Sequence, residues 1–358
     1  KEVGYGILVS PLNMAGDVVT YNGQHVIEFS GEHPCDQHGS AIEKIRHGSN
    51  TKEIIPGLTV HHSFSSKPAN NYKDYYEKMT TYAAILWAHA QAIDPTVTPM
   101  TFAPTPTEGL ETIFEYHDTA SSRAGITVLA QKLELEKIAI VGVGGTGSYV
   151  LDLVAKTPVK EIHLFDGDTF YSHNAFRAPG ALSMSELSRS RKKVSYFKER
   201  YSRMRRGIFA HPYSVNESNA SELEGMSFVF LCMDGGASKR EVIEKLEAYN
   251  IPFVDCGMGL QLVDGSLLGI LRVTTSTPQE RAHVRDKNRI SFADEGGINE
   301  YSQNIQVAEL NAMSAALAVI KWKKLFGFYS DLEQEHHTTY TIDGNHLSNE
   351  DMHETNNN

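Results

Sequence analysis

Cysteine is scarce in this chain of 358 residues, with only Cys35, Cys232 and Cys256 present and no CxxC pair among them. Three scattered thiols exclude a disulfide framework and a four-cysteine zinc site, and they favour a cytoplasmic location. No apolar run approaches the ~20 residues of a membrane span, so we expect no membrane association. The first residues lack a signal-peptide pattern, and a start at Lys1 instead of Met suggests a fragment or a processed chain.

A basic excess is also missing, because 33 Lys and Arg stand against 44 Asp and Glu, for a net charge of −11. A general nucleic-acid binder needs basic residues to neutralise phosphates, so we exclude that class. One basic stretch, Arg189–Arg206, runs against this trend. We interpret it as a solvated helix face that also presents Lys193 to a ligand phosphate.

The order of the sequence patterns predicts two domains and a tail. Residues 1–117 mix short strand-like runs with turn signals and one helical repeat at residues 70–93, which indicates a smaller α+β domain. Strand-like and helical segments alternate over residues 118–348, which predicts an α/β, Rossmann-like, mainly parallel sheet with helices on both faces. Its last helix is expected to carry Leu310, Met313, Leu317 and Ile320 on one face. Residues 349–358 are expected to form a polar tail.

A glycine turn between a strand and a helix is the strongest local motif. Gly142, Gly144 and Gly147 match GxGxxG, in which the first glycine allows the turn, the second lets phosphate approach and the third lets helix and strand pack closely. The free N–H groups of the helix N-terminus favour a phosphate there. Asp166 ends the next strand, where a carboxylate can bind ribose hydroxyls. This pattern predicts a nucleotide site without separating NAD from ATP, and glycines that only turn the chain remain the structural alternative.

The charged residues that follow favour ATP. An enzyme that cleaves ATP must neutralise a triphosphate and hold a metal, whereas hydride transfer leaves the pyrophosphate intact. The stretch after the second strand supplies Asp168, Asn174 and Arg177, and Lys193 follows. Asp234 lies at the end of a later strand, at the sheet edge where ligands bind. Two acids, an amide, two cations and a late aspartate suit Mg-ATP better than NAD.

These motifs resemble the adenylyltransferases of the ThiF type, which include sulfur-carrier-activating enzymes and the adenylation domains of ubiquitin-activating enzymes. The resemblance runs from about residue 123 to residue 345. "GVGGTG" is similar to the family's GxGGxG, "DGDTFYSHNAFRAPG" to its D-x-D and S-N-L-x-R-Q stretch, and "CMDGGASKR" to its C-x-D-N motif. It implies Mg²⁺-dependent adenylation by ATP of the C-terminal carboxylate of a ubiquitin-like or sulfur-carrier protein ending in Gly-Gly, by a homodimer.

The resemblance also implies roles for single residues. Asn174 and Arg177 would contact phosphates, Lys193 would bind the α- or β-phosphate, and Asp234 would bind Mg²⁺. Arg123 would correspond to an arginine that reaches the partner subunit's site. The carboxylate that attacks ATP is already ionised at pH 7, which explains a site with cations and no obvious general base. The nucleotide-binding residues implied are Gly142, Gly144, Gly145, Gly147, Asp166, Asp168 and Arg123.

The chain departs from the family at several positions. The segment at residues 271–304, where ubiquitin-activating enzymes carry a thioester cysteine, has none, which leaves Cys35 and Cys256 as candidates. Ala178 replaces the family's glutamine and Gly235 its asparagine, so an inactive nucleotide-binding scaffold stays open beside an NAD-dependent oxidoreductase.

The N-terminal domain loosely resembles domains that precede bacterial ThiF-type proteins encoded near ubiquitin-like genes, a context that suggests antiviral defence. We expect it to recognise a carrier protein or a conjugation partner. His61, His62 and Lys67 are candidates for a polar site, with an ordinary strand and loop as the alternative.

Overall fold

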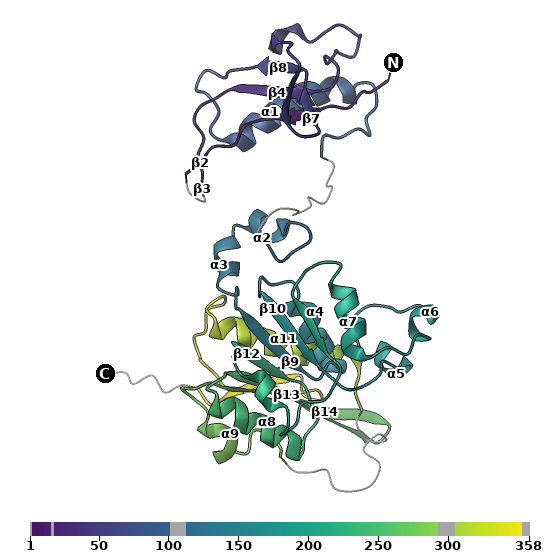
Figure 1. Cartoon of the computed structure of the whole chain (residues 1–358), viewed down its shortest axis with the longest axis vertical. Helices are drawn as coiled ribbons and strands as arrows, with labels where there is room; N and C mark the ends of the chain where they lie inside the picture. Colours follow the sequence, from purple (N-terminus) through teal and green to yellow (C-terminus); the bar gives the residue numbers. More distant parts are fainter. Residues whose placement is uncertain (1, 16–17, 101–111, 293–304, 353–358) are drawn as a thin grey trace, which may run out of the picture. The chain divides into compact units, whose positions relative to one another are not determined.

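The computed structural model describes residues 2–15, 18–100, 112–292 and 305–352 (Figure 1). The chain divides into two compact units, Lys1–Ala103 and Pro104–Asn358. Residues 113–115 belong to the second unit, because Glu115 N–H donates to the carbonyl of Met204 and Arg206 N–H to that of Ile113. Residues 101–111 lie outside the described residues.

The N-terminal unit is a small antiparallel sheet that packs against one long helix. Helix α1 (Tyr75–Gln91) begins after Asp74, whose carboxylate accepts the N–H of Glu77. Side chains of β4 alternate, so Ile27 and Phe29 face the core with Phe64. The sheet has the order β1 (Ile7–Val9), β4 (Val26–Ser30), β8 (His62–Ser65) and β5 (Arg46–Gly48), and two small hairpins pair β2 (Met14–Ala15) with β3 (Val18–Val19) and β6 (Lys52–Ile55) with β7 (Leu58–Val60). The unit is therefore α+β, as the sequence predicts.

The second unit is built on a sheet of eight strands in the order β11-β10-β9-β12-β13-β14-β15-β16. The pairings from β11 to β13 are parallel, and the three from β13 to β16 are antiparallel. The strands are β9 (Lys137–Val141), β10 (Glu161–Phe165), β11 (Ile208–His211), β12 (Phe228–Leu231), β13 (Phe253–Val263), β14 (Ser266–Ser276), β15 (His337–Thr341) and β16 (His346–Glu350). The prediction of a mainly parallel sheet is confirmed.

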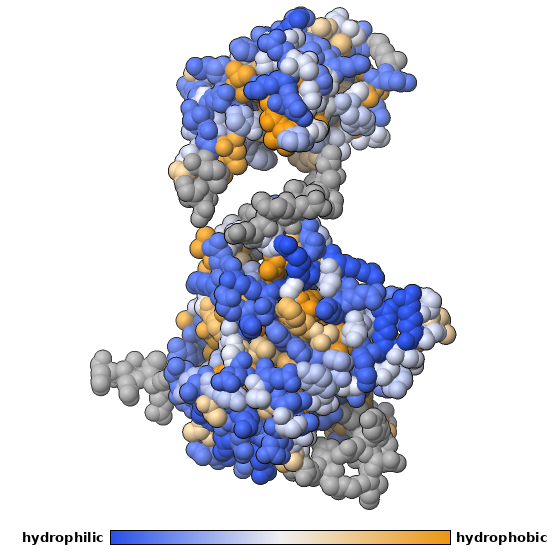
Figure 2. All heavy atoms as spheres, viewed as in Figure 1, coloured by the Kyte–Doolittle hydropathy of each residue, from blue (hydrophilic) through white to orange (hydrophobic). Residues whose placement is uncertain are grey.

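Helices cover both faces of this sheet. Its central strands carry apolar side chains on both faces, and packed helices bury these side chains. In β9, Ile138 and Ile140 belong to one buried cluster, and Ala139 and Val141 belong to the other. The helices are α2 (Thr119–Ala124), α3 (Thr127–Gln131), α4 (Gly145–Val154), α5 (Ser172–Ala175), α6 (Met184–Leu187), α7 (Lys193–Tyr201), η2 (Ala220–Leu223), α8 (Ala237–Ala248), α9 (Ala282–Asp286) and α11 (Ala308–Leu325). In Figure 2 hydrophilic side chains dominate the visible face of each unit, as expected when these clusters lie inside. Within the described residues, we find no helix that combines the length and apolar composition needed to cross a bilayer.

Two details of the structure differ from what the sequence pattern indicates. Helix α11 turns a different face to the core: Asn311, Ala315 and Trp322 are fully buried, whereas Ile320 is exposed. The reason is that α11 packs against α4, and small side chains permit that close approach. The expected tail also starts too early, because β16 continues to Glu350.

Candidate functional site

The turn between β9 and α4 requires glycine at two positions, because neighbouring atoms leave no room for a Cβ. Gly142 has φ +86°, and a Cβ there would lie 2.6 Å from the carbonyl oxygen of Cys232. A Cβ at Gly147 would lie 1.9 Å from the carbonyl oxygen of Gly142. Gly144, which precedes α4, is different, because a Cβ there would meet no atom of the described residues within 4 Å. The turn therefore leaves open space at the helix N-terminus, where a phosphate can approach the backbone.

Asp166 fixes the turn from the end of β10. Its Oδ2 accepts the N–H of Val143 and its Oδ1 the N–H of Asp168, both at 2.9 Å. Burial raises the pKa of Asp166, and the nearby positive charge of Lys193 opposes that rise. Each carboxylate oxygen can accept a second hydrogen bond, so a ribose hydroxyl can still donate to this group.

Lys193 places a cation beside these acids. It is the first residue of α7, and its N–H donates to the carbonyl of Asp168. Its Nζ lies 2.6 Å from Asp168 Oδ2 and 3.7 Å from Asp166 Oδ1. The Lys193 side chain is 8% exposed, whereas that of Asp168 is 68% exposed. The Lys193 ammonium is thus buried next to Asp166, and its other partner, Asp168, is exposed to solvent. Solvent screening weakens the ion pair with Asp168, so a phosphate can replace that carboxylate.

Two buried donors at the next turn lack acceptors. Asn174, in α5, accepts the N–H of Tyr171 with Oδ1, while its Nδ2 has no partner within the described residues. Arg177 Nε is buried and also unpartnered in that part of the chain. Burial lowers the pKa of Arg177, and the charge of Asp234 opposes this. Buried donors without acceptors are rare in folded proteins, so this pair indicates an anionic ligand.

Asp234 follows β12 and is exposed at the carboxyl edge of the sheet. Its electrostatic effect on Arg177 brings the two residues into one site. Over the described residues, no group of three or more His, Cys, Asp or Glu side chains is arranged to hold a metal ion. Magnesium bound with a nucleotide uses one or two carboxylates together with the phosphates, and Asp234 fits that kind of site. Arg123 lies in α2, and its side chain is outside the described part.

The structure adds two residues that sequence reasoning missed. Burial lowers the pKa of His173, as do the nearby charges of Arg177 and Lys193, so His173 lies among the predicted phosphate ligands. Asn311 of α11 accepts a hydrogen bond from the Thr146 hydroxyl at 2.9 Å, and its Nδ2 is buried without a partner in the described chain. His173 stands inside a motif that the sequence had marked, whereas no local signal marks Asn311.

The cysteines differ in access. Cys35 is exposed, and its thiol donates to the carbonyl of His33 at 3.7 Å. Cys256 is buried, and its hydrogen bond raises the pKa of Cys232. Burial opposes thiolate chemistry at Cys256, and the raised pKa opposes it at Cys232, so Cys35 is the exposed thiol of the three.

The expected polar site of the N-terminal unit is only partly assembled. The rings of His61 and His62 have centroids 6.4 Å apart, and His61 Nδ1 accepts the N–H of Gly31. Lys67 lines a cavity with other residues instead.

Comparison with known proteins places both parts of the chain. Residues 1–119 match a domain of unknown function, DUF6791, and residues 119–358 match the ThiF family. A comparison with curated proteins finds no match.

Several solved structures share the fold at low sequence identity. MccB from E. coli with selenomethionine MccA is 17% identical, covers 67% of this chain and 73% of its own, and has a TM-score of 0.51. MccB with ATP is 16% identical over 67% and 74%, with a TM-score of 0.50. PaaA is 16% identical over 83% and 94%, with a TM-score of 0.51. The family match covers most of the chain, so this protein belongs to the ThiF family of adenylyltransferase-type enzymes.

Proposed function

We propose that this enzyme uses Mg-ATP to adenylate the C-terminal carboxylate of a ubiquitin-like or sulfur-carrier protein that ends in Gly-Gly. The observation that carries the proposal is the buried Arg177 Nε, which has no partner among the described residues and lies near Asp234, together with Lys193 and its two acids. This arrangement supplies separate partners for phosphates, metal and ribose. A similar structure, MccB, is known with ATP and with MccA, which supports a nucleotide and a small protein or peptide as the two substrates.

In the proposed reaction a carrier carboxylate oxygen attacks the α-phosphorus of ATP, and the bond to pyrophosphate breaks. Both reactants are anions, so the site must offset their repulsion and hold them in line. Lys193 and Arg177 bring positive charge to the phosphates, and the backbone at Gly144 leaves room for them. Asp166 orients the ribose. Magnesium, held by Asp234, would neutralise charge on the departing pyrophosphate.

This chemistry requires no proton acceptor, because the carrier carboxylate is ionised at neutral pH. His173 lies near Arg177 and Lys193 with a lowered pKa, so its imidazole is mainly neutral at pH 7. We therefore assign it to hydrogen bonding with a phosphate or with the carrier tail.

Carrier-dependent exchange of radioactive pyrophosphate into ATP tests the proposal directly. We expect exchange with a small Gly-Gly-ending protein encoded beside this gene, and none with the same protein lacking its last two residues. Arg177→Gln should abolish exchange, whereas Arg189→Gln, at an exposed arginine outside the site, should retain it. ATP binding without exchange would indicate an inactive scaffold, and failure to bind ATP would favour a nicotinamide enzyme; either result refutes the proposal.

The proposal extends to the assembly and its surroundings. We infer a homodimer, as is common among enzymes that this chain resembles, located in the cytoplasm and acting on a protein instead of a nucleic acid or membrane. The net charge of −11 supports the exclusion of nucleic acid. A role in bacterial antiviral defence belongs to the same proposal, and phage challenge of cells that lack the gene would test it.

A further inference from the structure

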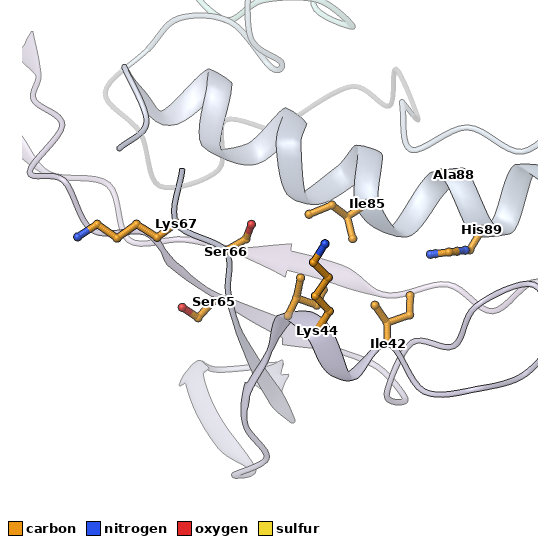
Figure 3. Close-up of a pocket in the computed structure, with 9 residues that line it drawn as sticks. Ile42, Lys44, Ser65, Ser66, Lys67, Ile85, Ala88 and His89 are labelled. Carbon is orange, nitrogen blue, oxygen red and sulfur yellow. The ribbon is translucent and has the colours of Figure 1, made fainter. Parts of the chain in front are cut away.

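The N-terminal unit contains a cavity of about 540 Å³ between α1, the 3₁₀ turn η1 (Glu43–Ile45) and the end of β8 (Figure 3). This volume falls within the range of roughly 300–1,000 Å³ that is common for small-ligand sites. Ile42 and Ile85 provide apolar walls, and Lys44, Ser66 and His89 provide polar groups. The cavity therefore offers both an apolar surface and hydrogen-bonding partners.

Lys44 gives the cavity its charge. Figure 3 shows the Lys44 side chain rising from η1 toward α1, with its ammonium on the side of Ile85. We find no ion pair or hydrogen bond to this ammonium from any described residue, and no carboxylate is among the side chains that line the cavity. Lys67 also lines the cavity, but Figure 3 shows its ammonium directed away from Lys44. One positive charge beside apolar walls favours a ligand with one negative charge.

The remaining polar groups favour a peptide over an inorganic anion. His89 Nδ1 lies 2.6 Å from the side-chain oxygen of Gln37, so this nitrogen carries the proton and donates. In the neutral ring, Nε2 is then an acceptor, which suits a peptide N–H and repels a phosphate oxygen. The Ser66 hydroxyl can donate to a carboxylate together with Lys44.

We propose that this cavity binds the free C-terminal carboxylate of a peptide whose last side chain is apolar. The carboxylate pairs with Lys44 and Ser66, the preceding N–H donates to His89, and the apolar side chain packs on Ile42 and Ile85. This site does not depend on the proposed adenylation, and its ligand differs from a Gly-Gly tail, which has no apolar side chain.

Calorimetric titration of the full chain with acetyl-leucyl-alanyl-leucine tests the site. We expect binding that weakens at least tenfold when the terminal carboxylate is replaced by an amide, and also when the last leucine is replaced by serine. Lys44→Met should weaken binding of the acid peptide at least tenfold, because it removes the charge and keeps the length. Lys67→Met is the matched control, since its ammonium points away, and it should change the affinity less than twofold.

The adenylation site could also attract a carboxylate, so Lys193→Met must bind the peptide as the parent does. Equal binding of the acid and amide peptides, equal effects of Lys44→Met and Lys67→Met, or no binding at millimolar peptide would each overturn the proposal. Tighter binding of inorganic phosphate than of the peptide would overturn it as well. Circular dichroism and thermal unfolding that match those of the parent confirm that the Lys44→Met variant is folded in both units.

Discussion

Replacement of Lys193 by methionine is the sharpest test of the nucleotide site, because an equally long lysine stands next to it as a control. Lys193 is buried between Asp166 and Asp168. Lys192 is exposed, and its Nζ donates to the carbonyl of Gly167 at 2.5 Å. Both substitutions remove one positive charge from the same stretch of chain, so any difference between them measures position and not net charge.

The expected loss follows from the surroundings of the ammonium. Asp168 is 68% exposed, so its ion pair with Lys193 is screened and contributes little. A phosphate can therefore take the place of Asp168 at low cost, and the new hydrogen bond to a charged group contributes about 1.5–3 kcal/mol. At about 1.4 kcal/mol per factor of ten, Lys193→Met should lower kcat/KM for pyrophosphate exchange by roughly 10- to 150-fold. Lys192→Met should lower it less than about threefold, because a single exposed hydrogen bond contributes little.

The assay is pyrophosphate exchange at saturating carrier, with ATP titrated for each variant. Thermal unfolding without ATP checks the fold, and we expect a lower midpoint for Lys193→Met because Asp166 then lacks its nearest cation. Equal losses for the two variants would refute the assignment of Lys193 as the phosphate ligand. A loss of stability without any change in kcat/KM would reduce Lys193 to a structural partner of Asp166.

Two further predictions concern the turn and the antiparallel strands. Gly147→Ala should lower the unfolding temperature strongly, because its Cβ would lie 1.9 Å from a backbone oxygen. Gly144→Ala should keep that temperature and weaken ATP binding, because its Cβ meets no described atom and would occupy the space that a phosphate needs. Calorimetry measures the first effect and nucleotide titration the second, and equal unfolding temperatures of the two variants would contradict this interpretation. His337 is buried and hydrogen-bonded to Thr274, and burial lowers its pKa to about 4. The unfolded imidazole takes up a proton near pH 6.5, so this residue's contribution to stability is complete above that pH and is lost as the pH falls toward 4, by on the order of 3 kcal/mol. In His337→Gln, denaturant unfolding should show a smaller loss between pH 6.5 and pH 4 than in the parent, and an identical pH profile would refute the assignment.

The sequence predicted the parts of the fold that depend on neighbours along the chain. The strand that ends at Val141 is apolar at every buried position, and the turn after it needs glycine for steric reasons that act over a few residues. The helix that begins after Asp74 carries its own cap. Such features are local, so periodicity and residue type are enough to reveal them.

Features that depend on packing between distant segments could not be predicted. The β13–β14 hairpin did have a local signal that the sequence analysis missed, because Asp264 and Gly265 form its two-residue turn with φ of +49° and +78°. The antiparallel pairing of β14 with β15 joins distant segments and has no such signal. The apolar periodicity of α11 groups Ile320 with Leu317 on one face, yet Ile320 is exposed and Ala315 is buried, because α11 packs against α4 and small side chains fit that contact. Asn311 reaches the glycine turn from 165 residues away, and only the folded chain brings it there.

Three buried donors that have no acceptor among the described residues lie in the candidate nucleotide site, and the sequence analysis identified only two of them. Asn174 Nδ2, Arg177 Nε and Asn311 Nδ2 are buried, and an unsatisfied buried donor costs about 1–3 kcal/mol. A folded protein tolerates such groups where a ligand satisfies them when it binds, so the stability given up here is recovered as affinity. The sequence identified the first two because they stand in a motif with charged neighbours. Asn311, the third, lies in a helix whose sequence indicates only packing. Its place in the site follows from its contact with the glycine turn, since a Cβ at Gly145 would lie 2.3 Å from Asn311 Nδ2.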